Sequence, residues 1–168
     1  QVDRKRKSVA RPLLYLHNAL MTATQPSIIR EGVSLKEFTT FKVGGDAQYF
    51  LDADSISDVI EALSWAYDRA IPITILGGGS NVIIADNGVQ GLVIRLGLEE
   101  WTAVQDGDRV TLTVGAGNIW DQIVRRTVQA GWAGLECLVG IPGRAGAAPI
   151  QNIGAYGQEF SGVAQAVQ

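Results

Sequence analysis

The chain has 168 residues, of which 46% are hydrophobic and 18% are charged, and its net charge is −3. This composition indicates one ordinary domain or two small subdomains with a substantial core, and it excludes a disordered chain. The sequence contains no apolar run of 18 residues or more, so no membrane span is expected.

The charge is spread unevenly along the sequence. Residues 1–30 carry six basic residues and one acidic residue, about +5 against a total of −3, so the remaining chain carries about −8. Such an acidic body argues against non-specific nucleic-acid binding, which needs a basic surface. The single cysteine, Cys137, excludes an intrachain disulfide and a cysteine-based zinc site, and we expect no metal.

The N-terminal segment, residues 1–32, is predicted to be a tail outside the folded domain. Basic residues 4–7 followed by the apolar residues 13–16 are faintly similar to a signal peptide. Pro12 and His17 interrupt that apolar segment, so a flexible or weakly helical tail is the preferred interpretation.

Residues 33–97 are predicted to form a first α+β subdomain, with folded structure beginning near Thr39. Residues 47–51 are typical of a strand, and Ser55 is a suitable N-cap for a helix with apolar residues at helical spacing. Two further apolar runs, residues 73–76 and 91–96, are predicted as strands. The order is therefore strand, helix, strand and strand.

A glycine-rich loop follows residues 73–76, and the apolar residues 82–84 after it are predicted to begin another strand. Its three glycines lack Cβ atoms, so a ligand can approach the backbone, and successive N–H groups can converge on an anion. A serine and an asparagine add donors, which suits a phosphate bound without lysine or arginine. The alternative is an ordinary glycine-rich hairpin. The loop lacks the lysine of a Walker loop and the third glycine of a Rossmann fingerprint.

Residues 98–168 are predicted to form a second, incomplete α+β subdomain. Strands at residues 101–104 and 110–114 flank a turn at residues 106–108. A helix with apolar residues from Ile119 to Val128 follows, and Gly131 is a plausible stop for it.

The stretch from residue 134 to residue 157 contains six glycines and two prolines. It is too apolar for a solvated linker and too broken for a long helix. Backbone with small side chains is what a wall packed against a flat ligand requires, and a buried connector is the alternative.

Four motifs in this order resemble those of the UDP-N-acetylenolpyruvoylglucosamine reductase (MurB) family. They are Thr-Thr-Phe-Lys-Val-Gly-Gly at 39–45, Leu-Gly-Gly-Gly-Ser-Asn at 76–81, Val-Gly-Ala-Gly at 114–117, and the stretch at 141–157 that ends in Pro-Ile-Gln-Asn-Ile-Gly-Ala-Tyr-Gly. The glycine loop also occurs in other flavin oxidases of the same fold, whereas the last motif is highly specific. The resemblance, which runs from about residue 33 to the end, implies an FAD-binding domain of the vanillyl-alcohol-oxidase (PCMH) type. Such a domain has two α+β subdomains with the flavin between them.

The resemblance also implies which residues contact FAD. They are Gly77, Gly78, Gly79, Ser80 and Asn81 at the diphosphate, and Gly115, Gly117, Ile141, Pro142, Gly143, Gly146, Ala147, Ala148 and Ile153 along the cofactor. Tyr156 is expected on the nicotinamide and substrate side of the flavin. Arg144 departs from the family, which usually has a smaller residue there, and it is expected to face solvent rather than to reach a phosphate.

The activity implied by the resemblance is reduction of the enolpyruvyl ether of a UDP-sugar, with NADPH as hydride donor and FAD as carrier. The product would be UDP-N-acetylmuramate, a precursor of peptidoglycan, made by a cytoplasmic enzyme that is usually a monomer in this family. The catalytic serine, arginine and glutamate of the family are expected beyond Gln168, together with the substrate-binding domain. We therefore expect this fragment alone to be inactive, without a catalytic residue of its own.

Three acidic residues, Asp121, Glu136 and Glu159, are expected in helix-surface or loop roles rather than as substitutes for the missing acid. Two alternatives to the reductase fragment are a stand-alone, non-catalytic flavin-binding module and a different FAD oxidase of the same fold. Such oxidases usually attach flavin through histidine or cysteine, which makes this alternative the weakest.

Overall fold

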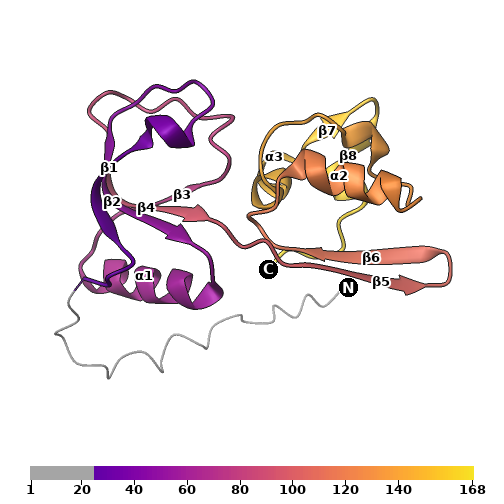
Figure 1. Ribbon diagram of the computed structural model, residues 1–168, viewed down its shortest axis with the longest axis horizontal. Coiled ribbons are helices and arrows are strands. Elements are labelled where there is room, and N and C mark those ends of the chain that lie inside the picture. Colours follow the sequence, from indigo (N-terminus) through magenta and orange to yellow (C-terminus); the bar gives the residue numbers. More distant parts are fainter. Residues whose placement is uncertain (1–24) are drawn as a thin grey trace, which may run out of the picture.

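The computed structural model describes residues 25–168. The segment that is similar to a signal peptide, and His17 within it, lie outside the described residues. The described chain forms two halves, and the segment that follows strand β4 joins them (Figure 1).

The first half is built on a four-stranded sheet with the order β1-β2-β4-β3. Strand β1 (Arg30–Ser34) pairs antiparallel with β2 (Asp46–Ala53). Strand β4 (Val89–Leu96) runs parallel to β2 on one side and to β3 (Ile73–Leu76) on the other. Helix α1 (Ile56–Asp68) connects β2 to β3. The carboxyl ends of three parallel strands therefore meet at one edge of the sheet.

Helix α1 begins at the residue that the sequence predicts. The Oγ of Ser55 accepts the N–H of Asp58 at 3.1 Å, and the carboxylate of Asp58 accepts the N–H of Ser55 at 3.0 Å. This capping box satisfies two N–H groups that the helix itself leaves unpaired. The helix covers one face of the sheet and shares with it a core of Ile29, Leu51, Ala53, Ala62, Trp65, Ala66, Leu92 and Ile94.

The other face of the sheet is covered by a short 3₁₀ helix, η1 (Leu35–Phe38), and by part of the loop that follows β3. Its core consists of Leu35, Ala47, Phe50, Leu76 and Val93, with Phe38 and Ile84 packed against it. The central strands β2 and β4 thus contribute buried residues to both faces, as expected for strands that pair in parallel.

The second half consists of a long hairpin and a compact cluster of short elements around one helix (Figure 1). The hairpin is formed by β5 (Trp101–Asp106) and β6 (Arg109–Val114), and the helix is α2 (Trp120–Gln129). The short elements are η2 (Glu136–Leu138), η3 (Ala145–Ala147), α3 (Ala148–Gln151), β7 (Gly154–Ala155), β8 (Gln158–Glu159) and η4 (Phe160–Gly162). Their shared core is Trp120, Ile123, Val124, Leu138 and Ala148.

Gly131 ends α2 as predicted. Its φ is +76°, its N–H donates to the carbonyl of Val128 at 3.0 Å, and the N–H of Trp132 donates to the carbonyl of Thr127 at 2.9 Å. This pair of bonds is a Schellman motif, which needs a left-handed residue at the position of Gly131.

Two predictions about the first half are wrong. Ordered structure begins well before Thr39, because β1 starts at Arg30, ahead even of the predicted subdomain boundary at residue 33. Residues 82–84 are not a strand. Ile84 packs against the core and against the turn at Gly44, while Ile83 is 78% exposed, so this run follows the surface instead of pairing in the sheet.

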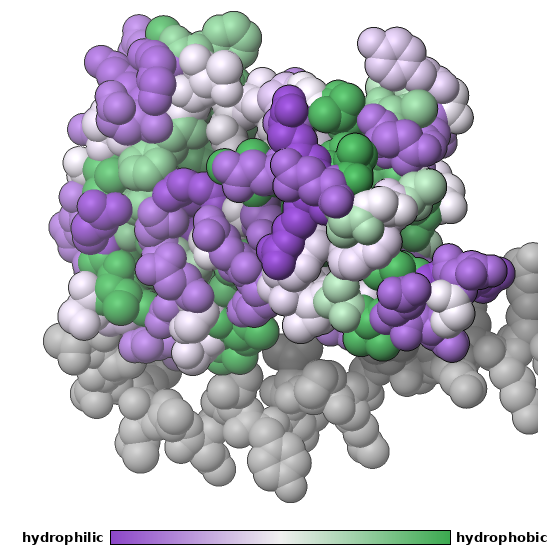
Figure 2. All heavy atoms as spheres, turned by 45° about the vertical axis from the view of Figure 1, so that its right-hand side comes forward, coloured by the Kyte–Doolittle hydropathy of each residue, from purple (hydrophilic) through white to green (hydrophobic). Residues whose placement is uncertain are grey.

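Hydrophobic side chains are not confined to the cores, and Figure 2 shows them among hydrophilic residues on one face of the molecule. Ile75 of the edge strand β3 and Ile150 of α3 are two exposed examples. Within residues 25–168, no helix combines the length and apolar character needed to cross a membrane.

Candidate functional site

The loop after β3, residues 77–81, lies at the carboxyl edge of the parallel strands. Within residues 25–168, none of its five consecutive backbone N–H groups donates a hydrogen bond, and the side chains of Ser80 and Asn81 also make none. Gly79 is buried and Gly77 and Ser80 are half-buried, and N–H groups at such positions normally have acceptors. A run of unengaged donors at this edge is therefore suited to an anion supplied by a ligand.

The three glycines of this loop serve two different purposes. Gly79 is buried, and a Cβ there would overlap the carbonyl oxygen of Phe38 and lie 2.8 Å from the Cα of Thr39. Its own carbonyl accepts the N–H of Thr40 at 3.0 Å. Gly79 thus anchors the loop to the chain, whereas Gly77 and Gly78 face the second half of the molecule.

The stretch that the sequence predicts as a wall comes from the second half and faces this loop. A Cβ on Gly78 would lie 3.3 Å from the Cα of Gly143, and one on Gly77 would lie 3.7 Å from the Cβ of Ala147. A Cβ on Gly143 would lie 3.4 Å from the Oγ of Ser80. The structure therefore brings together two glycine-rich stretches that are far apart in the sequence.

Backbone hydrogen bonds hold residues 143–147 against the turn that precedes α2. The carbonyl of Gly143 accepts the N–H of Trp120 at 3.0 Å, and the N–H of Ala145 donates to the carbonyl of Asn118 at 2.8 Å. The N–H of Gly146 donates to the carbonyl of Ala116 at 3.0 Å. A Cβ on Gly146 would lie 2.8 Å from the Cβ of Ala116, so this glycine permits the close packing of the two turns.

Gly115 and Gly117 lie against the segment that joins the two halves. The N–H of Gly115 donates to the carbonyl of Glu100 at 2.8 Å, and that of Gly117 donates to the carbonyl of Leu98 at 2.7 Å. A Cβ on Gly117 would lie 2.5 Å from the carbonyl carbon of Gly97. In this structure the two glycines therefore serve the junction between the halves.

The predicted cofactor-lining residues differ in what their side chains contact. Ala148 is 1% exposed in the core of the second half, and Ile141 and Ile153 pack against the same core. Pro142 is exposed, and Ala147 is half-buried opposite Gly77. The side chains of Ala148, Ile141 and Ile153 thus serve the core of the second half.

Tyr156 occupies the tip of the short hairpin between β7 and β8. Its side chain is 90% exposed, and its φ of +51° together with that of Gly157, +84°, gives both turn residues positive φ. A non-glycine residue with positive φ is uncommon. The hairpin presents the phenol ring to solvent without a hydrogen bond from another described residue.

Arg144 does not face solvent as predicted. Its side chain is half-buried, and its Nη1 donates to the carbonyl of Gly117 at 2.6 Å and to that of Leu96 at 3.3 Å. Its Cγ would lie 3.6 Å from a Cβ on Gly78. Burial, and then the charge of Arg95, lower the pKa of Arg144 from its ordinary value. A guanidinium remains cationic at neutral pH nonetheless.

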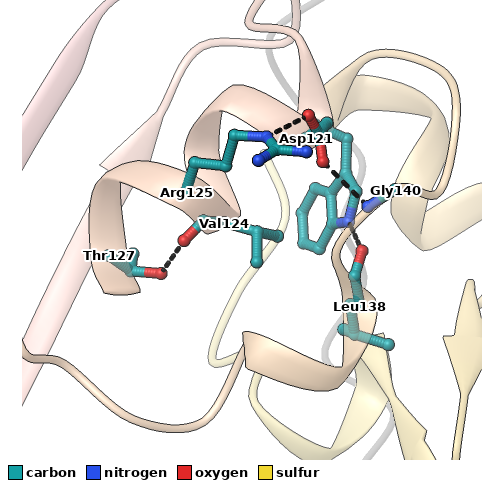
Figure 3. Close-up of polar contacts among 7 residues, drawn as sticks. Asp121, Val124, Arg125, Thr127, Leu138 and Gly140 are labelled. Carbon is teal, nitrogen blue, oxygen red and sulfur yellow. Dashed lines mark hydrogen bonds and ion pairs between the residues drawn. The ribbon is translucent and has the colours of Figure 1, made fainter. Parts of the chain in front are cut away.

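Asp121 at the start of α2 holds Gly140, the residue before the segment 141–148 (Figure 3). One carboxylate oxygen accepts the Nε–H of Arg125 at 2.6 Å, and the other accepts the N–H of Gly140 at 2.8 Å. These two contacts, the Arg125 bond first, lower the pKa of Asp121. Nearby, the indole N–H of Trp120 donates to the buried carbonyl of Leu138 at 3.0 Å.

Glu136 and Glu159, the other two acidic residues that the sequence places in structural roles, also have partners. Hydrogen bonds from the N–H groups of Glu136 itself and of Gly134 lower the pKa of Glu136. The carboxylate of Glu159 accepts the amide of Asn152 at 2.9 Å.

A cavity of about 910 Å³ lies elsewhere in the first half, and no residue of the loop 77–81 or of the segment 141–148 lines it. Its walls include Asp46, Ala47 and Gln90, which stand at the starts of β2 and β4. Ligands of open sheets with parallel strands bind at the carboxyl ends. The unengaged loop at that edge is therefore the stronger candidate site.

Comparison with known proteins agrees with this geometry. Residues 47–168 match the family described as FAD binding domain. The chain belongs to this FAD-binding family. The α+β fold and the FAD cofactor that the sequence predicts are thereby confirmed.

The resemblance to the UDP-N-acetylenolpyruvoylglucosamine reductases is confirmed as well. The chain is 47% identical over 127 residues to the protein of that name from Streptomyces coelicolor, covering 76% of this chain and 32% of that protein. It is 37% identical to the one from Gloeobacter violaceus, covering 83% of this chain and 46% of that protein. The chain thus spans 32% and 46% of the lengths of these two relatives.

A solved structure leads to the same fold. The crystal structure of the UDP-N-acetylenolpyruvylglucosamine reductase MurB from Thermus caldophilus matches with a TM-score of 0.58 and 32% sequence identity. The match covers 78% of this chain and 45% of that chain. The fold of this chain therefore has a counterpart in a protein that is named as a reductase.

Proposed function

We propose that this chain forms the FAD-binding part of an NADPH-dependent reductase that converts UDP-N-acetylglucosamine enolpyruvate to UDP-N-acetylmuramate. Relatives with that enzyme name are 37% and 47% identical to this chain over 83% and 76% of its length. We also propose a cytoplasmic site for the reaction, because NADPH and UDP-sugars are cytoplasmic metabolites.

The observation that carries the proposal is the set of unengaged donors at residues 77–81. A diphosphate needs several hydrogen-bond donors and close backbone approach, and this loop offers five N–H groups, a hydroxyl and an amide. The residues present therefore fit FAD. We propose that Gly77, Gly78, Ser80 and Asn81 hold its diphosphate, with Gly79 keeping the loop in place.

The remaining predicted residues take roles that follow from where they lie. Gly143 and Ala147, opposite the loop, would close the other side of the diphosphate site and exclude water from it. The exposed Tyr156 is free to contact a nicotinamide or a substrate that reaches the flavin. FAD, when bound, supplies hydride transfer between NADPH and the enolpyruvyl group.

We assign no proton donor among the described acidic residues. Asp121, Glu136 and Glu159 each accept hydrogen bonds that fix loops, and the contacts of the first two lower their pKa values. A general acid needs the opposite shift, toward the operating pH.

The test is a titration of the purified chain with FAD, followed by flavin fluorescence, and then anaerobic addition of NADPH. Gly78→Ala should weaken FAD binding by about 10-fold or more, because its new methyl group would occupy the space between the loop and Gly143. Gly162→Ala is the matched control, since a Cβ there meets no atom within 4 Å. A wild-type chain that takes up no FAD would refute the proposal.

A further inference from the structure

Arg144 lies between the two halves of the molecule, next to the loop that we propose for the diphosphate. Its aliphatic part packs against Gly78, and its Nη1 bonds the carbonyls of Leu96 and Gly117, one from each half. Leu96 ends β4, whose residue Arg95 pairs with the last residue of β3. The guanidinium therefore lies at the same carboxyl edge of the sheet as residues 77–81.

The charge of Arg144 lacks a carboxylate partner in the described part of the chain. No acidic oxygen there lies within 4.0 Å of its nitrogens, and its Nε and Nη2 donate no hydrogen bond. The neighbouring Arg95 shows the contrast, because its Nη1 is 2.5 Å from a carboxylate oxygen of Asp52. A half-buried cation without a directly bonded carboxylate is less favourable than a paired one, and an anionic ligand would supply that partner.

Repulsion within the chain favours the same conclusion. Burial and the charge of Arg95 both lower the pKa of Arg144, and Asp52 is already engaged by Arg95. Two guanidinium groups therefore lie near one another, and the charges of Glu99 and Asp52 act on Arg144 in the opposite direction without a described carboxylate oxygen within 4.0 Å of its nitrogens. Among the described residues, Arg144 therefore keeps donor nitrogens without an acceptor, next to a loop whose five N–H groups also lack acceptors.

We propose that Arg144 is a binding residue for the FAD diphosphate, with two carbonyls orienting its guanidinium and its Nε and Nη2 donating to the phosphate oxygens. This inference rests on the proposed function. It adds a charged contact to a loop that was expected to bind phosphate without lysine or arginine. Charge-assisted hydrogen bonds are about twice as strong as neutral ones, so this contact would be a large part of the affinity.

The experiment measures the Kd of the chain for FAD at several salt concentrations, by flavin fluorescence, for three variants. Arg144→Gln should raise Kd by about 10- to 100-fold and flatten its dependence on salt, because one screened charge contact is lost. Arg144→Lys, which keeps the charge, should keep the salt dependence of the wild type. Arg109→Gln removes the same charge from an exposed hairpin position and should change neither quantity.

Each outcome separates the alternatives. If Arg144 only joins the two halves, Gln and Lys variants should weaken FAD binding equally and leave the salt dependence unchanged, which would overturn the inference. An Arg144→Gln variant that binds FAD as tightly as the wild type would also overturn it, while the proposed function would stand. A wild-type chain that binds no FAD would instead refute the proposed function itself. Circular dichroism of each variant shows whether a change in Kd reflects unfolding.

Discussion

Replacing Gly79 by alanine should destabilise the fold strongly, because two separate costs coincide at this position. The backbone φ of Gly79 is +66°, a left-handed conformation that costs an L-residue about 1–2 kcal/mol. In addition, the new Cβ would overlap the carbonyl oxygen of Phe38, and moving that chain away would break the bond from the N–H of Thr40 to the carbonyl of Gly79. The lost bond is worth about 1 kcal/mol.

The expected total is about 2–3 kcal/mol of unfolding free energy. In urea denaturation this corresponds to a fall of about 1–3 M in the midpoint, because small proteins lose about 1–3 kcal/mol per molar urea. Gly107→Ala is the matched control: its φ is +58°, and a Cβ there meets no atom within 4 Å. The control should show only the cost of the left-handed conformation, about 1–2 kcal/mol.

The difference between the two variants isolates the contact with Phe38. If Gly79→Ala is no less stable than Gly107→Ala, the loop does not depend on close packing against residues 38–40, and Gly79 is not its anchor. A second readout is FAD affinity, which should fall for Gly79→Ala because the loop would be displaced from residues 38–40.

Two more predictions concern the contacts in Figure 3. Asp121→Asn should remove the ion pair with Arg125 and weaken the hydrogen bond from the N–H of Gly140. In the wild type the folded state lowers the pKa of Asp121. The stability that Asp121 contributes is therefore complete above the ordinary carboxyl pKa and is lost as pH falls through the lowered value. Urea midpoints measured from about pH 7 down to about pH 3 should therefore decline less steeply for the variant, and parallel curves would contradict this. Trp120→Phe should cost about 1–3 kcal/mol, since it leaves the buried carbonyl of Leu138 without its donor, and an unchanged urea midpoint would argue against that bond.

Much of the fold could be predicted where local chemistry decides the structure. Ser55 and Asp58 form the cap that the sequence indicates, Ile73–Leu76 is a strand with the expected bounds, and Gly131 ends its helix. At both helix ends the decisive hydrogen bonds join residues close together in the chain. Such signals are visible without knowledge of the rest of the chain.

The failures occur where distant parts of the chain decide the structure. Strand β1 has an almost fully exposed burial pattern, and its existence depends on pairing with β2, so the sequence shows no alternation to predict it. Residues 82–84 have the composition of a strand, but the turn at Gly44 and Gly45 packs against them; the N–H of Gly45 donates to the carbonyl of Ala85 at 2.9 Å.

The candidate site was predictable as two glycine-rich stretches, but the use of each glycine was not. A glycine that faces a ligand and one that faces another part of the backbone are identical in sequence. Gly78 faces Gly143 of the other stretch, whereas Gly79 and Gly146 are needed for closer contacts with Phe38 and Ala116. The burial of Arg144 could not be predicted, because its two carbonyl partners lie 48 and 27 residues away in the sequence.

The segment that joins the two halves is held by the turn before α2, through the carbonyls of Leu98 and Glu100. A connection held in this way cannot act as a free hinge. The distance between the loop 77–81 and the facing residues 143–147 is therefore set before a ligand binds. Little conformational freedom would then be lost on association, and rigid, preorganised recognition is the consequence.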